Sequence, residues 1–440
     1  MKNIYCEKHW NKQVCRKPVD GLDEMLNAYP NKNNLVEMRH VDIEYGFGAK
    51  KFTAIKDLSL NIYEGEILGL VGESGSGKST TGRALIGLTP HAFGSIKIID
   101  RIIPKNINKG ITFTKKHKEM INFMVNKVQM IFQDPTNSLN PYANVERVVG
   151  EGLQNTKNAK HIYMLEHDRV TITELHKQIK SINARLKKID QLIHLYNKEY
   201  NNAIDSSYNF IYSNIYEHVI ELNKKYKNFN SALTYLDERK SDWALANKKS
   251  EKEARYELII DILKQVGLDE SVLNRYPLEF SGGQQQRLGI SRSVVIQPKL
   301  LIADEPISAL DVSIQAQVIN IFKELKERFD LTMLLIAHDL RMVEYISDRI
   351  AVINKGVLLE IGPTHEVSKN SYHPYTKSLL EAVPSITGEK GSLLGTEYDP
   401  SIHNYSADNQ PKWQNLGNGH FVLLTDDELK EIKKQKKSKK

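Results

Sequence analysis

Five short apolar runs punctuate the chain and predict buried strands, at residues 66–72, 127–133, 299–305, 332–338 and 349–354. Helical patterns lie between several of them, including one over residues 78–88 that follows the first strand. Strands that alternate with helices predict an α/β core with a largely parallel sheet, which binds ligands at the carboxyl ends of its strands. None of these runs approaches the roughly 18–20 apolar residues needed to cross a bilayer.

Residues 156–250 have a different periodicity. Apolar side chains recur at spacings of three and four along two segments, 172–196 and 215–236, which the polar stretch 201–207 separates. This pattern predicts an antiparallel coiled-coil hairpin about 40–50 Å long, with residues 201–207 at its tip. The alternative is two ordinary amphipathic helices packed on a globular domain.

Composition and charge add compartment and partner expectations. With 440 residues, 40% of them apolar, the chain can bury a sizeable core. It has two cysteines and no apolar leader at its start, so we expect no disulfide framework and a reducing cytoplasm. Cys6, His9 and Cys15 could bind a metal, but their irregular spacing argues against such a site.

The net charge of +7 is concentrated at one end, where residues 430–440 contain seven lysines. We expect this basic tail to be solvated and disordered. Attraction to anionic lipid headgroups is the sharper alternative. Nucleic acid is not expected as a partner, because the tail lacks aromatic side chains that could stack on bases.

The first predicted strand runs into a phosphate-loop motif, made of Gly72, Glu73, Ser74, Gly75, Ser76, Gly77, Lys78 and Ser79 and followed by Thr80. The glycines of this motif let backbone N–H groups turn around phosphate oxygens at a helix N-terminus. Lys78 would reach the β- and γ-phosphates, and Ser79 would hold Mg²⁺. By itself, the motif indicates nucleotide binding.

Two carboxylates end the predicted strand at residues 299–305. Asp304 fits a ligand of Mg²⁺, and Glu305 fits the base that polarises an attacking water. A buried strand carries such charge only to place it at a site. The alternative is an acid pair on the surface.

Residues between the two carboxylates and the phosphate loop complete the pattern. Ser281, Gly282, Gly283 and Gln284 are expected to open a helix, with Ser281 as its N-cap and glycines that allow close approach to phosphate.

Three further side chains fit the same site. Gln133 and His338 end predicted strands, where Gln133 can sense Mg²⁺ and the attacking water and His338 can contact the γ-phosphate. Tyr45 lies upstream of the phosphate loop and can stack on adenine, with Phe47 as a competitor for that role.

Together these motifs resemble the ATP-binding subunits of ATP-binding-cassette (ABC) transporters, above all the oligopeptide and dipeptide importers. The likeness is carried by residues 132–141, 275–284, 303–317 and 373–376, and it covers residues 35–155 and 255–384. The sequence of residues 307–313 resembles the OppF-type subunit more than its OppD-type partner.

The resemblance implies an α/β fold: an ABC-type P-loop nucleotide-binding domain with a helical subdomain at residues 35–362, into which the hairpin at 156–250 is inserted. Residues 1–34 would be an N-terminal extension, and residues 363–440 an oligopeptide-transporter-type C-terminal region that ends in the basic tail. The motif at residues 373–376 is expected to begin a helix, with its His and Tyr in packing and capping roles.

The resemblance also implies roles and partners. Two cassettes would sandwich two ATP molecules. The ligands of Mg²⁺ would be Ser79, Gln133 and Asp304. The catalytic residues would be Glu305, Gln133 and His338. The segment Ser281–Gln284 would contact ATP held by the opposing cassette, and Asp311 would lie between the cassettes. Expected partners are a second, OppD-like ATPase subunit, two transmembrane permeases and an extracytoplasmic peptide-binding protein, with this chain peripheral at the cytoplasmic face of the membrane.

Two other classes compete with the transporter. A coiled-coil ATPase of DNA repair or chromosome maintenance also carries a helical hairpin inside its cassette, but this insertion is short and has no Cys pair at 201–207. A translation-type factor normally has two cassettes in one chain, and this sequence has one phosphate loop and one signature.

Overall fold

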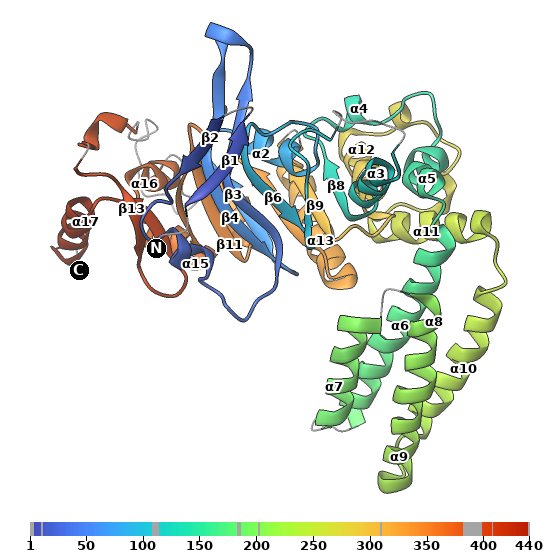
Figure 1. The fold of residues 1–440 in the computed structure, drawn as a ribbon. Coiled ribbons are helices and arrows are strands. Elements are labelled where there is room, and N and C mark those ends of the chain that lie inside the picture. The colour runs from blue at the N-terminus through green and yellow to red at the C-terminus, as the bar shows by residue number, and fades with distance from the viewer. Residues whose placement is uncertain are drawn as a thin grey trace. The chain divides into compact units, whose positions relative to one another are not determined.

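The computed structural model describes residues 4–9, 12–107, 114–182, 186–200, 203–308, 310–381, 398–406 and 408–438. Contacts divide the chain into two compact units (Figure 1). The first consists of Met1–Leu139, Phe280–Ser293 and Pro298–Lys440, and the second of Asn140–Glu279 and Val294–Gln297. Each unit has its own apolar core.

An eight-stranded sheet forms the centre of the first unit, in the order β13-β14-β12-β11-β5-β10-β9-β8. Its strands are β5 (Ile67–Val71), β8 (Val128–Ile131), β9 (Leu300–Asp304), β10 (Thr332–Ala337), β11 (Arg349–Asn354), β12 (Val357–Pro363), β13 (Lys412–Asn415) and β14 (Phe421–Leu424). The neighbours from β11 to β8 are parallel, and these are the five strands that the apolar runs predict. The prediction of an α/β core with a largely parallel sheet is therefore confirmed.

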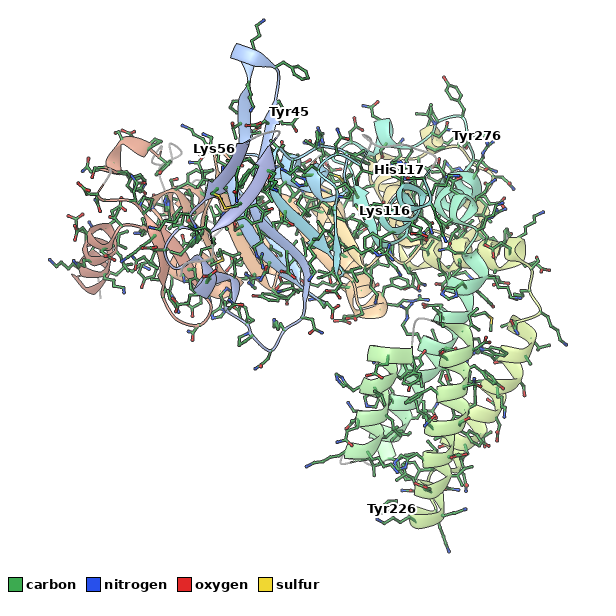
Figure 2. All side chains as sticks on the ribbon, viewed as in Figure 1. Tyr45, Lys56, Lys116, His117, Tyr226 and Tyr276 are labelled. Atoms are coloured by element: carbon green, nitrogen blue, oxygen red, sulfur yellow. A yellow bond between two sulfur atoms is a disulfide. The ribbon has the colours of Figure 1, made fainter. Side chains whose placement is uncertain are left out.

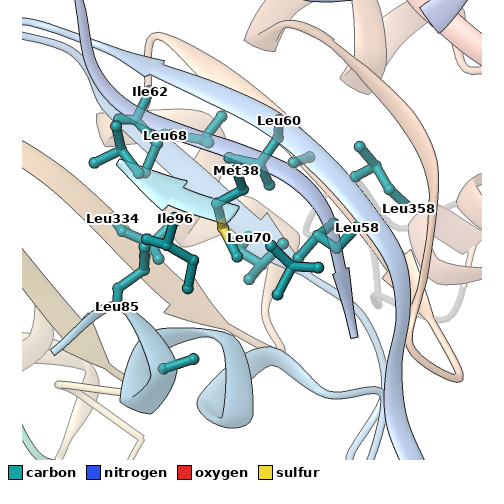
Figure 3. Close-up of a cluster of buried hydrophobic side chains, with 14 of the residues drawn as sticks. Met38, Leu58, Leu60, Ile62, Leu68, Leu70, Leu85, Ile96, Leu334 and Leu358 are labelled. Carbon is teal, nitrogen blue, oxygen red and sulfur yellow. The ribbon is translucent and has the colours of Figure 1, made fainter. Parts of the chain in front are cut away.

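A second, antiparallel sheet in the first unit escaped the sequence analysis. It has the order β4-β3-β6-β7 and consists of β3 (Asn34–Tyr45), β4 (Phe52–Tyr63), β6 (Phe93–Ile98) and β7 (Arg101–Ile102). Figure 3 shows how its side chains pack with those of β5 and β10, at Met38, Leu58, Leu60, Ile62, Leu68, Leu70, Ile96 and Leu334. Burying each such side chain contributes roughly 1.5–3 kcal/mol, so this shared core holds the phosphate loop on a rigid base.

The N-terminal strands β1 (Tyr5–His9) and β2 (Lys12–Arg16) form a hairpin that carries a disulfide. Cys6 and Cys15 are direct partners across this antiparallel ladder. The sequence predicts no disulfide framework and did not reveal this single bond, which forms because strand pairing brings together two cysteines that lie nine residues apart in the sequence. The described residues also contain no group of three or more side chains able to hold a metal ion.

The helices of the first unit cover its sheets and build its C-terminal part. They are α1 (Leu22–Leu26), α2 (Lys78–Leu85), α3 (Lys115–Lys127), α4 (Pro135–Ser138), α12 (Gly282–Val294), α13 (Val312–Phe329), α14 (Leu340–Ile346), α15 (Thr364–Asn370), α16 (Pro374–Glu381) and α17 (Asp426–Ser438), with short 3₁₀ turns η1 (Gly48–Lys50) and η6 (Pro400–Ile402). Within the described part of the chain, no helix combines the length and apolarity that a membrane span requires.

The C-terminal region is more ordered than expected. The lysine-rich tail is helical as far as Ser438, so the prediction of a disordered tail is wrong for residues 430–438. Leu429 and Ile432 are buried on one side of α17, and Thr425 and Glu428 bond each other's backbone amides at its start. The capping box and the apolar pair stabilise a helix that charge alone does not predict.

The second unit is helical. It contains α5 (Val145–Thr156), α6 (Ala159–Ile182), α7 (Lys187–Leu195), α8 (Ile204–Asn209), α9 (Tyr216–Tyr226), α10 (Asn230–Ala246) and α11 (Glu251–Gln265), with π-helical turns η2 (Tyr196–Tyr200) and η3 (Phe210–Ile215) and 3₁₀ turns η4 (Glu270–Val272) and η5 (Pro277–Glu279). The apolar positions of the predicted heptads pack into one core, which includes Ile172, Leu175, Ile179, Ile189, Ile193, Tyr196, Ile215, Val219, Leu222, Phe229 and Leu236.

The predicted coiled-coil hairpin is nevertheless wrong, because the chain folds back more often than two arms allow. Helix α6 ends at Ile182 and α7 begins at Lys187, inside the expected first arm. Ser207, in the expected tip, is buried and donates a 2.6 Å hydrogen bond to Asp168 of α6. Exposed Tyr226 instead ends α9, before the turn to α10 (Figure 2). The segment is a short helical bundle.

Candidate functional site

The phosphate loop leaves a fully buried strand and enters a helix. Strand β5 ends at Val71, and α2 begins at Lys78, with Gly77 before it at a φ of 105°. A Cβ on Gly77 would lie 2.4 Å from the Ile55 side chain, so both the backbone angle and the space require glycine. The loop therefore presents its N–H groups at the N-terminus of α2, where anions bind.

Lys78 is buried at the base of this loop. Its Nζ donates to the carbonyl oxygens of Gly72 and Glu73, at 2.7 and 2.8 Å. Burial lowers the pKa of Lys78, and the nearby Glu305 and Asp304 carboxylates oppose that shift. The ammonium group is thus held beside the loop by weak carbonyl partners, which a phosphate oxygen can replace.

Ser79 and Asp304 form a pair of oxygen ligands. The Ser79 hydroxyl donates to Asp304 Oδ1 at 2.8 Å, which joins the start of α2 to the end of β9. Burial raises the pKa of Asp304, and the hydrogen bond from Ser79 opposes this rise. A buried carboxylate beside a hydroxyl, next to a phosphate loop, is an oxygen set that suits Mg²⁺.

Glu305 is held between two polar side chains. Its Oε2 atom accepts from Gln133 Nε2 at 3.1 Å and lies 3.2 Å from His338 Nδ1. Its backbone has a φ of 44°, and its amide donates to the Ile336 carbonyl of β10 at 2.9 Å. Three chain segments that are far apart in the sequence therefore bring Glu305, Gln133 and His338 together. Gln133 lies two residues beyond the end of β8, and not at the strand end that the sequence predicts.

These residues line a cleft of about 400 Å³, formed by Tyr45, Phe52, Ala54, Ser74, Gly75, Gly77, Lys78, Ser79, Thr80, Gln133, Glu305 and His338. Tyr45 lies at the end of β3 (Figure 2). It donates a hydrogen bond to the Thr80 hydroxyl at 3.4 Å. Phe47 is 94% exposed and does not line the cleft. The cleft thus combines an aromatic wall with a phosphate loop and a carboxylate.

Sequence reasoning missed two side chains near this site. Phe52 lines the cleft as the cross-strand partner of Tyr45, a relation that strand register alone reveals. Tyr375, from the C-terminal region, accepts a hydrogen bond from the Glu73 amide at 2.8 Å. His373 and Tyr375 are buried at the start of α16, and His373 Nδ1 accepts from the Tyr375 amide, as the expected packing and capping roles require.

The signature segment lies outside the cleft of its own chain. Ser281 precedes α12, and its hydroxyl accepts from the Gln284 amide while Gln284 Oε1 accepts from the Ser281 amide. Ser281 and Gly282 are exposed, and no residue from 281 to 284 lines the cleft. Asp311 is also exposed and stands at the N-terminus of α13.

Comparison with known proteins finds two matching family models. The model described as ABC transporter matches residues 55–308, more than half of the chain. The model described as the C-terminal region of oligopeptide/dipeptide transporters matches residues 359–406.

Named relatives match nearly the whole chain. The oligopeptide transport ATP-binding protein AmiF of Streptococcus pneumoniae is 37% identical over 402 residues, which cover 91% of this chain and 98% of AmiF. The oligopeptide transport ATP-binding protein OppF of Bacillus subtilis is 35% identical over 397 residues, which cover 90% of this chain and 98% of OppF. Among solved structures, a dimeric ATP-binding cassette bound to ADP and phosphate is 20% identical, with a TM-score of 0.48 over 75% of this chain and 98% of that chain.

Identity of this extent to oligopeptide transport ATP-binding proteins, together with both family models, sets aside the DNA-repair and translation classes. The chain belongs to the ATP-binding proteins of the ABC transporter family, in the oligopeptide and dipeptide group, and is an ATPase subunit of such an import system.

Proposed function

We propose that this chain binds ATP together with Mg²⁺ in the cleft at the phosphate loop and hydrolyses it to drive oligopeptide uptake through partner permeases. The observation that carries the proposal is the meeting of Ser79 with Asp304 and of Glu305 with Gln133 and His338, beside Lys78. Glu305 and the loop line one cleft of about 400 Å³, which suits a nucleotide, and Asp304 accepts a hydrogen bond from Ser79 of this lining.

The residues divide the work as phosphoryl transfer requires. Ser79, Asp304 and Gln133 would hold the magnesium ion, which supplies charge compensation on the phosphates when bound. Lys78 and the loop amides compensate the remaining negative charge. Glu305 accepts hydrogen bonds and orients the attacking water, and His338 contacts the γ-phosphate. Tyr45 stacks on adenine, with Phe52 as its neighbour in the wall.

The signature segment indicates how two ATPase subunits would assemble. Ser281–Gln284 is exposed at a helix start and does not line the cleft of its own chain. We assign it to ATP bound by a second, OppD-like ATPase subunit, with Asp311 at the contact between the two. Each subunit then completes the other's site, so hydrolysis requires the pair.

The proposed transport partners are those that the family resemblance implies. Two transmembrane permeases would carry the peptide, and an extracytoplasmic protein would deliver it. The chain would then be peripheral, at the cytoplasmic face of the membrane. Closure of the ATPase pair on ATP and its reopening after hydrolysis would move the permeases.

Replacement of Glu305 by Gln tests the proposal in the assembled transporter. This substitution keeps the size of the side chain and one acceptor oxygen but removes the carboxylate, so nucleotide binding should stay within about twofold while turnover falls roughly 10²–10⁴-fold. The assay compares fluorescent-ATP binding, phosphate release and uptake of labelled oligopeptides. A matched control is Glu327→Gln, on the exposed side of α13.

Normal hydrolysis by the Glu305→Gln transporter would remove Glu305 from its role. The transport function itself would be contradicted if DNA stimulated ATP hydrolysis by the isolated chain and permeases did not.

A further inference from the structure

The C-terminal region reaches the phosphate loop through a single side chain. Tyr375 is fully buried, and its hydroxyl accepts a 2.8 Å hydrogen bond from the Glu73 amide. The two residues lie 302 positions apart in the sequence. Residue 73 belongs to the part matched by the ABC transporter family, and residue 375 to the part matched by the oligopeptide/dipeptide transporter C-terminal region. The contact is therefore a tertiary link between two parts of one unit.

This hydrogen bond acts on a peptide group that Lys78 also holds. The peptide that joins Gly72 to Glu73 offers its carbonyl to Lys78 Nζ at 2.7 Å and its N–H to the Tyr375 hydroxyl. The plane of this peptide is thus fixed at both ends. Lys78 must turn toward phosphate when nucleotide binds, and Tyr375 then remains as the side-chain partner of that peptide.

Tyr375 is itself held firmly at the start of α16. Its amide donates to His373 Nδ1 at 3.1 Å, and its ring packs edge-on against Tyr398 with centroids 5.2 Å apart. The preceding turn is anchored on Glu360 of β12, a fully buried carboxylate.

Glu360 collects three hydrogen-bond partners. The amides of Tyr372 and His373 lie 2.8 and 3.0 Å from its two oxygens, and His420 Nε2 lies 2.8 Å away. A carboxylate bound in this way ties α16 to the main sheet. The Tyr375 hydroxyl consequently has a fixed position relative to β12, which makes it a rigid support and not a mobile side chain.

The loop has little room to reorient around this support. A Cβ on Gly72 would lie 2.1 Å from the Ile353 carbonyl, so the loop runs directly against β11 at this point. The Ser76 amide also donates to the Glu73 carbonyl at 3.2 Å. A rotated Gly72–Glu73 peptide would disturb both the turn and the direction of the N–H groups that follow it.

We propose that Tyr375 is a positioning residue for nucleotide binding: its hydroxyl holds the Gly72–Glu73 peptide so that the loop keeps its phosphate-binding shape when Lys78 leaves the loop carbonyls. The inference rests on the proposed role of residues 72–79 as the nucleotide-binding loop. It gives the C-terminal region a part in binding the phosphates that ATP and ADP share.

Replacement of Tyr375 by Phe tests this role, because it keeps the buried ring and removes the hydrogen-bond acceptor. We expect a weaker affinity of the full chain for both MgATP and MgADP, by about three- to tenfold, as the loss of one neutral hydrogen bond implies. In the assembled transporter, KM for ATP should rise by a similar factor while kcat stays within about twofold.

The matched control is Tyr398→Phe, the same chemical change in the ring that packs on Tyr375. If Tyr375 only packs the core, the two variants lower the melting temperature alike and neither changes nucleotide affinity. That result overturns the proposal. A loss of affinity confined to Tyr375→Phe, at equal melting temperatures, supports it.

Hydrogen exchange provides a second measurement that needs no variant. The Glu73 amide of the nucleotide-free wild-type chain should exchange slowly, because it is bonded to a buried acceptor. Exchange at the rate of an open surface loop would overturn the proposal even if Tyr375→Phe failed to fold.

A parallel Lys78→Ala variant separates this inference from the proposed function. If Lys78→Ala abolishes hydrolysis and Tyr375→Phe changes nothing, the phosphate loop works and Tyr375 does not position it. If Lys78→Ala hydrolyses ATP normally, the proposed function fails first.

Discussion

His91 and His373 are buried imidazoles whose environment favours the neutral form. Burial, together with the charge of Lys105, lowers the pKa of His91 to about 4. Burial and the neighbouring His403 lower the pKa of His373 to about 3. In the unfolded chain both rings titrate near a pKa of about 6.5. Between these values the unfolded state binds more protons than the folded state.

The pH dependence of stability follows from this difference. The contribution of each histidine is complete above pH ~6.5 and is lost as the pH falls toward the folded-state pKa, by up to about 1.4 kcal/mol per pH unit. We predict that the unfolding free energy declines from pH 6.5 to pH 5. His91→Gln should make this slope shallower by the equivalent of about one proton taken up on unfolding. Urea unfolding at four pH values measures the slope. Parallel slopes for wild type and His91→Gln would contradict the lowered pKa.

At the scale of elements, the helical bundle depends on a buried polar contact between α6 and α8. Ser207 Oγ donates to Asp168 Oδ2 at 2.6 Å and lies 2.9 Å from the Tyr196 hydroxyl. The Asp168 side chain has no exposed surface. Removal of the serine hydroxyl would leave a buried carboxylate oxygen without this donor.

We therefore predict that Ser207→Ala destabilises the bundle by about 1–3 kcal/mol, the cost of a buried group that loses its partner. Ser206→Ala, an exposed neighbour on the same helix, should be neutral within about 0.5 kcal/mol. Hydrogen exchange across α6 and α8 measures both. Equal behaviour of the two variants would instead favour an exposed tip at residues 201–207.

At the scale of the whole molecule, the proposed sharing of each ATP between two subunits is the feature that experiment can address. The cleft is lined by the phosphate loop and Glu305, and by none of the signature residues. We predict that Ser281→Arg leaves fluorescent-ATP binding by the isolated chain within about twofold while hydrolysis by the assembled transporter falls at least about 100-fold. The control is Ser271→Arg, at an exposed position outside the signature.

Hydrolysis by the Ser281→Arg transporter at the wild-type rate would exclude a role for the signature at a partner's site. Loss of ATP binding by the isolated chain would show that the arginine damages the chain's own fold or cleft.

The five parallel strands and the phosphate loop were predictable because their signals are local. A buried parallel strand requires a continuous apolar run, and the turn between β5 and α2 requires glycines at defined positions. The antiparallel sheet gave no such signal. Strands β3 and β4 are long, and their mixed burial and register shifts blur any simple alternation.

The sequence by itself determined the family, the order of the motifs and the residues available for chemistry, because each of these is written in short stretches of chain. Only the tertiary structure decided which distant groups meet: Glu73 with Tyr375, Cys6 with Cys15, and Ser207 with Asp168. Periodicity indicates which side chains are buried but not how often the chain reverses direction, so it did not predict the helical bundle. Long-range contacts depend on the packing of whole elements, and no local pattern encodes that packing.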